Sequence, residues 1–141
     1  MFPCLTPDES DESDERPNLP ARFRGGCHCG KVKFLVTVRG WRASACNCSI
    51  CTMKGFLHVI VPSADFELLT PGSALTTYTF NTGTAKHHFC SSCGVHSFYV
   101  PRSHPDGFSV NAHCIEDAEL AWFDVEAFDG RDWEAHVARI R

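Results

Sequence analysis

The feature that most constrains this chain is a set of nine cysteines among 141 residues. Seven of them fall into three tight units, which are Cys27-His28-Cys29, Cys46-Asn47-Cys48-Ser49-Ile50-Cys51 and Cys90-Ser91-Ser92-Cys93. Two cysteines separated by one or two residues can bring their sulfurs onto one metal ion, because a turn places them at the spacing of adjacent tetrahedral ligands. The pattern therefore predicts a fold whose loops are fastened by metal rather than by a large core.

The N-terminus and the hydropathy of the chain bear on whether these cysteines form disulfides. No apolar run reaches the roughly 18 residues of a membrane span, and the first 16 residues lack the basic start and apolar stretch of a secretory signal. We therefore expect a cytoplasmic protein, with the nucleus as the alternative compartment, and no membrane association. Thiols stay reduced in these compartments, which favours metal ligands over disulfides.

Acidic residues are concentrated at the N-terminus. Residues 1–16 hold six acidic residues and one arginine, a net charge of −5, whereas the remainder of the chain has a net charge of +1. A charged segment with few apolar side chains cannot offset its ordering entropy, so we expect a disordered acidic tail over residues 1–20 and one zinc-binding domain over residues 21–141. The nearly neutral body makes nucleic acid an unlikely partner, and the sequence predicts no oligomeric state.

Short alternating runs after residue 21 predict a mainly β fold of short antiparallel strands. The clearest run is the period-two pattern of Val32, Phe34, Val36 and Val38. Further strands are expected at residues 58–61, 76–80, 95–100, 108–113 and 122–127. Only two short helical pieces are expected, a turn or single helical turn within residues 44–53 and a helix over residues 133–140.

Four of the clustered cysteines are predicted to form one closed site. They are Cys27, Cys29, Cys90 and Cys93. Four protein ligands complete the tetrahedral coordination of a structural zinc ion, and this site would join positions that are far apart in the sequence. The alternative is two pairs of buried or redox-active thiols.

The remaining unit supplies three ligands, Cys46, Cys48 and Cys51. Three protein ligands leave one coordination position for water or substrate, which is typical of catalytic zinc. Three thiolates on Zn²⁺ give a net charge of about −1, and such a centre suits a thiol substrate, because metals bind thiols in their deprotonated form. The alternative is a second structural zinc whose fourth ligand is Cys114, Cys4 or a histidine.

The residues around these units resemble the glutathione-dependent formaldehyde-activating enzyme family, and within it the centromere protein V group. The matching stretches are GGCHCG at 25–30, CNCSIC at 46–51, TYTFNT at 77–82 and HHFCSSCGV at 87–95. The resemblance covers about residues 22–136. It implies a mainly β fold of the Mss4-like type with two zinc ions per chain, one on the first and last cysteine pairs and one on the middle triplet.

The resemblance also implies a reaction, the joining of glutathione and formaldehyde to S-(hydroxymethyl)glutathione by a carbon–sulfur lyase working in the synthetic direction. The partners would then be a small-molecule thiol and a carbonyl compound. The alternative is a non-catalytic two-zinc scaffold that binds a protein partner.

His87 is the candidate catalytic residue outside the cysteines. It lies in the family's His-x-Phe-Cys pattern, three residues before Cys90. Two roles stay open for it, a proton shuttle or a hydrogen-bonded strand histidine. Lys54 and Arg102 can each pair with a carboxylate of a peptide-like thiol, but we expect both to be solvated surface charges.

Overall fold

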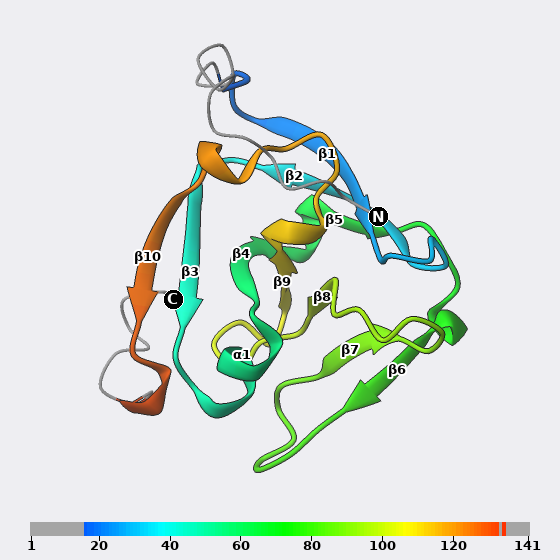
Figure 1. Cartoon of the computed structure of the whole chain (residues 1–141), viewed down its shortest axis with the longest axis vertical. Coiled ribbons are helices and arrows are strands. Elements are labelled where there is room, and N and C mark those ends of the chain that lie inside the picture. Colours follow the sequence, from blue (N-terminus) through cyan, green and yellow to red (C-terminus); the bar gives the residue numbers. More distant parts are fainter. Residues whose placement is uncertain (1–15, 133, 135–141) are drawn as a thin grey trace.

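Three sheets of short strands form the body of the computed structural model, which describes residues 16–132 and 134 (Figure 1). The first sheet has the order β1 (Ala21–Gly26), β2 (Lys33–Val38), β5 (Phe66–Leu68). The second has the order β10 (Asp124–Phe128), β3 (Arg42–Cys46), β4 (Leu57–Pro62), β9 (Gly107–Asn111), β8 (Phe98–Tyr99). The third pairs β6 (Leu75–Tyr78) with β7 (His87–Cys90).

Helical structure is scarce in the described residues. The one α-helix there, α1 (Ser49–Lys54), follows β3. Short 3₁₀ turns occupy Ser63–Asp65, Gly72–Ala74, Ala112–Cys114, Leu120–Trp122 and Gly130–Asp132. None of these helices is long and apolar enough to cross a membrane.

The core lies under one face of β2. Phe34, Val36 and Val38 are at most 1% exposed and alternate with less buried residues, which confirms the period-two strand. The ring of Phe34 packs on those of Phe66 and Phe98, with centroids 5.3 Å and 6.2 Å apart. The contact with Phe98 joins the first sheet to the second, because Phe98 belongs to β8 whereas Phe34 and Phe66 both belong to the first sheet.

The mainly β class with short strands is confirmed, with one exception to the antiparallel pattern. β10 runs parallel to β3. A parallel pair needs a long connection, and here the chain builds most of the molecule between the two strands before returning. As a result β3 and β10 end at the same edge of the sheet, where Phe128 lies opposite Cys46 (Figure 1).

The predicted strands at 58–61, 76–80, 95–100, 108–113 and 122–127 correspond to β4, β6, β8, β9 and β10 with shifted ends. Four strands were missed, namely β1, β3, β5 and β7. The predicted turn or helix at 44–53 was wrong in its first part, because residues 44–46 pair with β4 and β10 as part of β3. The helix begins only at Ser49, where the Cys48 side chain accepts a hydrogen bond from the backbone of Cys51.

The ends of the chain leave two predictions without an outcome. The expected helix at 133–140 lies outside the described residues, apart from residue 134. The same holds for residues 1–15 of the expected tail, while residues 16–20 are exposed and belong to no helix or strand. The division of the chain at residue 20 therefore stays a prediction.

Candidate metal centres and active site

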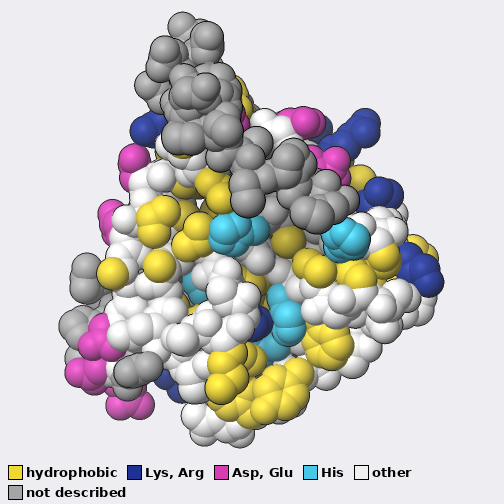
Figure 2. All heavy atoms as spheres, viewed as in Figure 1, with side chains coloured by type: hydrophobic (Ala, Val, Ile, Leu, Met, Phe, Trp, Pro, Cys, Tyr) yellow, Lys and Arg dark blue, Asp and Glu magenta, His cyan; other side chains and the backbone are white. Residues whose placement is uncertain are grey.

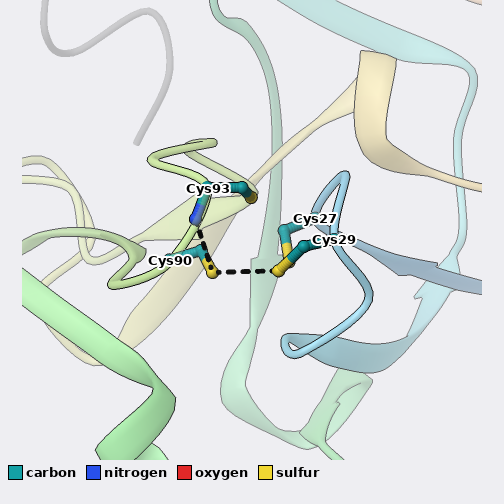
Figure 3. Close-up of side chains that lie close together, drawn as sticks. All are labelled: Cys27, Cys29, Cys90 and Cys93. Atoms are coloured by element: carbon teal, nitrogen blue, oxygen red, sulfur yellow. Dashed lines mark hydrogen bonds between the residues drawn. The ribbon is translucent and has the colours of Figure 1, made fainter. Parts of the chain in front are cut away.

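The four cysteines of the predicted closed site meet where the turn after β1 faces the end of β7 (Figure 3). All four sulfurs lie within 4.8 Å of one another. Cys29 Sγ is 3.7 Å from Cys27 Sγ and 3.6 Å from Cys90 Sγ. Zinc–sulfur bonds of about 2.3 Å in a tetrahedron put neighbouring sulfurs about 3.8 Å apart. This cluster could therefore hold a metal ion, and its spacing fits zinc.

Backbone N–H groups in both turns point at these sulfurs. Val32 N donates to Cys27 Sγ at 3.3 Å, and Ser92 N and Cys93 N donate to Cys90 Sγ at 3.3 Å and 3.4 Å. The N–H of Cys93 is the main reason that the pKa of Cys90 falls to about 6. The turn after β7 thus favours the thiolate form of Cys90, which is the form that binds a metal ion.

The second cluster lies at the junction of β3 and α1. Cys46 ends β3, Cys48 caps α1 and Cys51 lies in the helix, with all three sulfurs within 4.8 Å of one another. Within the described residues no other Cys, His, Asp or Glu joins this group. Cys114, one of the alternatives for a fourth ligand, lies in the 3₁₀ turn Ala112–Cys114 and belongs to neither cluster. Cys4 is outside the described residues.

The thiols of this second cluster are close enough to oppose each other's ionisation. Cys46 and Cys51 donate to the sulfur of Cys48 and lower its pKa to about 2. The contact with Cys48 raises the pKa of Cys46, and the contacts with Cys46 and then Cys48 raise the pKa of Cys51. A dication removes this conflict, because its charge stabilises three thiolates together. The donor set therefore fits zinc with one position left for another ligand.

The segment after β10 packs against the triplet. Asn47 Nδ2 donates to Asp129 Oδ1 at 3.1 Å, and Asn47 N donates to the carbonyl of Phe128 at 3.2 Å. These bonds fasten the loop between the first two cysteine ligands to a segment 82 residues away. This contact could not be predicted from the sequence, because no local pattern connects the two segments.

Within the segment after β10, Gly130 packs closely against Cys46 and Cys48. A Cβ at that position would collide with Cys46 Sγ and lie 3.0 Å from Cys48 Cβ. We expect Gly130→Ala to push Cys46 Sγ aside and to weaken zinc binding at the triplet by about 10- to 100-fold, as loss of ligand support generally does. Competition with a chromogenic chelator measures this affinity.

The matched control is Gly40→Ala, because a Cβ there meets nothing within 4 Å. Equal zinc affinity of the Gly130→Ala and Gly40→Ala proteins would contradict the close packing of Gly130 on the ligand.

A cavity of about 410 Å³ opens beside the triplet. It is lined by the end of β3, α1, β4, the loop between β6 and β7, the start of β7, β8 with the segment after it, and the residues at and after the end of β10. Its polar lining includes Cys46, Cys48, Cys51, His58, His87 and Arg102. Its apolar lining includes Ile50, Ile60, Phe80, Pro101 and Phe128. Figure 2 shows histidine side chains recessed at the centre of this face, with hydrophobic side chains gathered below them.

The structure places His87 in the wall of this cavity. The side chain is 3% exposed and its ring is sandwiched between those of Tyr99 and Phe80, with centroids at 4.9 Å and 5.5 Å. His87 Nδ1 lies 3.3 Å from Lys54 Nζ. Burial, and next the charge of Lys54, lower the pKa of His87 to about 4, so the ring is neutral near pH 7.

Lys54 is not the solvated surface charge that we expected. Its Nζ lies over the rings of Tyr99 and Phe56, 4.3 Å and 4.6 Å from the centroids. Burial lowers the pKa of Lys54 to about 8. The helix α1 ends at Lys54, so it carries a metal-ligand candidate and this ammonium on the same short segment. Arg102 is half-buried and lines the cavity.

Two buried residues of the site, His58 and Tyr99, were missed at the sequence level. His58 Nδ1 lies 3.0 Å from Ser109 Oγ and 3.1 Å from Tyr99 Oη. Burial lowers the pKa of His58 to about 4 and raises that of Tyr99. His58 falls in the predicted strand at 58–61, where a histidine beside apolar residues gives no sign of a functional role.

Comparison with known proteins decides the family. A sequence model described as glutathione-dependent formaldehyde-activating enzyme matches residues 22–130. The chain belongs to this family. The matched region contains all seven clustered cysteines and His87.

Two relatives extend this comparison. A Halomonas elongata protein, provisionally named a glutathione-dependent formaldehyde-activating enzyme, is 35% identical over 80 residues, which are 50% of this chain and 51% of that protein. The chain thus spans about half the length of this curated relative. A crystal structure of a Rhodobacter sphaeroides protein superposes with a TM-score of 0.69 at 32% identity, covering 74% of this chain and 99% of that one. This member of the formaldehyde-activating enzyme family therefore shares its fold with a solved structure.

Proposed function

We propose that the chain is a zinc-dependent carbon–sulfur lyase that joins or releases a small-molecule thiol and a small carbonyl compound. The observation that carries this proposal is that the three-cysteine cluster and His87 line the same cavity. The family name supports glutathione and formaldehyde as the pair. In this proposal the four-cysteine cluster holds a second, structural zinc ion.

Zinc on Cys46, Cys48 and Cys51 would supply a positive charge that keeps a substrate thiol in its nucleophilic thiolate form at neutral pH. The cavity walls then hold the thiol and the carbonyl compound together and exclude water. The sulfur–carbon bond forms as the carbonyl π electrons move to oxygen, and that oxygen must then receive a proton. The reverse sequence releases the carbonyl compound.

In this proposal His87 delivers that proton. A charged Lys54 donates to His87 Nδ1 at 3.3 Å, so the ring proton of the neutral imidazole lies on Nε2. Transfer of the Nε2 proton to the substrate oxygen, with Lys54 supplying a proton to Nδ1, leaves the ring neutral throughout. The low pKa of His87 suits this role, because imidazolium is never the resting state.

Arg102 supports a thiol that carries a carboxylate. Its side chain is half-buried in the wall of the same cavity. A guanidinium binds a carboxylate through two parallel hydrogen bonds, and a peptide-like thiol such as glutathione offers such a group.

The direct test measures rates, because the adduct of glutathione and formaldehyde also forms without an enzyme. Exchange NMR with ¹³C-formaldehyde gives the rates of adduct formation and breakdown with and without the protein. We expect acceleration in both directions that is lost when a chelator removes the zinc. A protein that binds two zinc ions and accelerates no thiol–carbonyl pair would instead support the non-catalytic scaffold.

Replacing His87 by glutamine is expected to lower kcat by about 100-fold, the usual contribution of one proton-transfer group. Both zinc ions should remain bound, as counted by plasma mass spectrometry. The control is His88→Gln, since His88 is the next residue but lies outside the cavity lining and pairs with Thr77 at 2.8 Å. Equal kcat values for the two variants would show that His87 does not transfer the proton.

A further inference from the structure

Tyr99 and His87 form a cross-strand pair in the wall of the active-site cavity. Lys86 and Val100 exchange two backbone hydrogen bonds, Lys86 N to the carbonyl of Val100 at 2.9 Å and Val100 N to the carbonyl of Lys86 at 3.0 Å. This antiparallel bridge places His87 opposite Tyr99 with both side chains on the same face. The two rings are 14° from parallel, and their centroids are 4.9 Å apart.

The ring of Tyr99 also lies under Lys54, the hydrogen-bond partner of His87. Lys54 Nζ is 4.3 Å from the ring centroid of Tyr99 and 3.3 Å from His87 Nδ1. A buried ammonium loses part of its hydration, and the negative face of an aromatic ring replaces some of it. Burial lowers the pKa of Lys54 to about 8, so the ammonium remains the main form near pH 7. One ring therefore contacts both members of the Lys54–His87 pair.

Tyr99 itself is held on its other sides. The residue is 7% exposed. Its Oη lies 3.1 Å from Nδ1 of His58 on β4. The ring of Phe56 meets that of Tyr99 at 89°, with centroids 5.2 Å apart. A side chain fixed by packing and by a hydrogen bond gives precise support to the functional groups that rest on it.

We propose that Tyr99 is a positioning residue whose ring holds Lys54 and His87 in contact, so that the resting imidazole of His87 carries its proton on Nε2. This inference rests on the proposed function. The hydrogen bond from Lys54 keeps Nδ1 unprotonated only while the two groups stay together. Tyr99 neither gains nor loses a proton, and the proton that reaches the substrate oxygen still comes from His87.

The first test reads the tautomer of His87 in zinc-loaded protein labelled with ¹⁵N-histidine. A single tautomer gives two well-separated ring ¹⁵N resonances, one from the protonated nitrogen and one from the unprotonated nitrogen. We expect this result, assigned by its loss in His87→Gln, for the wild type and for Tyr99→Phe, which keeps the ring. In Tyr99→Leu the two resonances should move toward each other, because Lys54 no longer selects one tautomer.

Phe98→Leu is the matched control. Phe98 is the other residue of β8 and is also buried, but it packs on Phe34 and Phe66 in the core and lies outside the cavity lining. The His87 resonances of Phe98→Leu should match those of the wild type. A Tyr99→Leu protein whose His87 resonances also match the wild type would overturn the inference and leave the proposed function standing.

A replacement that preserves shape covers the case in which Tyr99→Leu does not fold. Pentafluorophenylalanine in place of Tyr99 keeps a six-membered ring but removes the negative face that attracts the ammonium of Lys54. Compared with Tyr99→Phe, it should move the two His87 resonances toward each other. Unmoved resonances in this protein would also overturn the inference.

The second test is kinetic. We expect Tyr99→Leu to lower kcat by about 10- to 100-fold, because displacement of a reacting group by about 1 Å costs about 100-fold, with the KM for glutathione nearly unchanged. Tyr99→Phe should recover most of this loss, and every variant should keep both zinc ions. Equal kcat values for Tyr99→Leu and Phe98→Leu would contradict the inference. A wild-type protein that accelerates no thiol–carbonyl pair would overturn the proposed function and, with it, this role of Tyr99.

Discussion

A Cys90→Ser protein is expected to lose one of two zinc ions and to fail to fold stably. Cys90 is 1% exposed at the end of β7, and its sulfur lies 3.6 Å from that of Cys29, 61 residues earlier in the chain. Structural zinc sites contribute about 10–16 kcal/mol in zinc-finger peptides, whereas whole domains are stable by only about 5–15 kcal/mol. Circular dichroism, thermal unfolding and zinc analysis measure the outcome.

Cys114→Ser is the matched control for this experiment. Cys114 is a free, partly buried cysteine that belongs to neither cluster. Its replacement should retain both zinc ions and cost about 1 kcal/mol, the typical effect of a single substitution. A Cys90→Ser protein that is as stable as Cys114→Ser and binds two zinc ions would refute the structural role of the four-cysteine cluster.

Cys48→Ser is expected to have the opposite outcome, a folded protein without activity. Cys48 caps α1 by accepting the backbone N–H of Cys51 at 3.5 Å. Serine is among the preferred residues at this cap position, so the helix should persist. The triplet, however, loses a thiolate ligand and with it one zinc ion. A metal contribution of about 4 kcal/mol to the transition state corresponds to a fall in turnover of about 1000-fold.

Zinc analysis, exchange NMR and thermal unfolding together check this prediction. The control is Met53→Ala, since Met53 lies on the same helix and is 89% exposed. It should keep both zinc ions, the stability and the turnover. If Cys48→Ser retained two zinc ions and wild-type turnover, the triplet would not be the catalytic metal site.

The parts of the structure that the sequence predicted are those with a local signal. The cysteine units are local, and the alternation of Phe34, Val36 and Val38 directly describes the buried face of β2. The three-residue strand β5 and the four-residue β7 are too short to show a period. Their pairing is decided by neighbours elsewhere in the fold, which a single short segment does not encode.

The residues of the candidate site also divide into those with a local sequence signal and those without one. Both cysteine clusters were predicted, because each ligand unit is a short motif. The positions of Gly130 and His58 beside the cavity were not predicted, since each depends on contacts with segments far away in the chain. Lys54 was misjudged because lysine is usually exposed, whereas here its ammonium lies over the rings of Phe56 and Tyr99.

The strand β7 connects the cavity to the four-cysteine cluster within four residues, because it begins at His87 in the cavity wall and ends at Cys90 in that cluster. In the proposed function, zinc in the four-cysteine cluster therefore fixes the side chain that transfers the proton at the other site. Under zinc limitation, turnover should depend on the product of two occupancies and rise sigmoidally with bound zinc, rather than in proportion to it. A protein built in this way responds to zinc supply more steeply than a one-metal enzyme does.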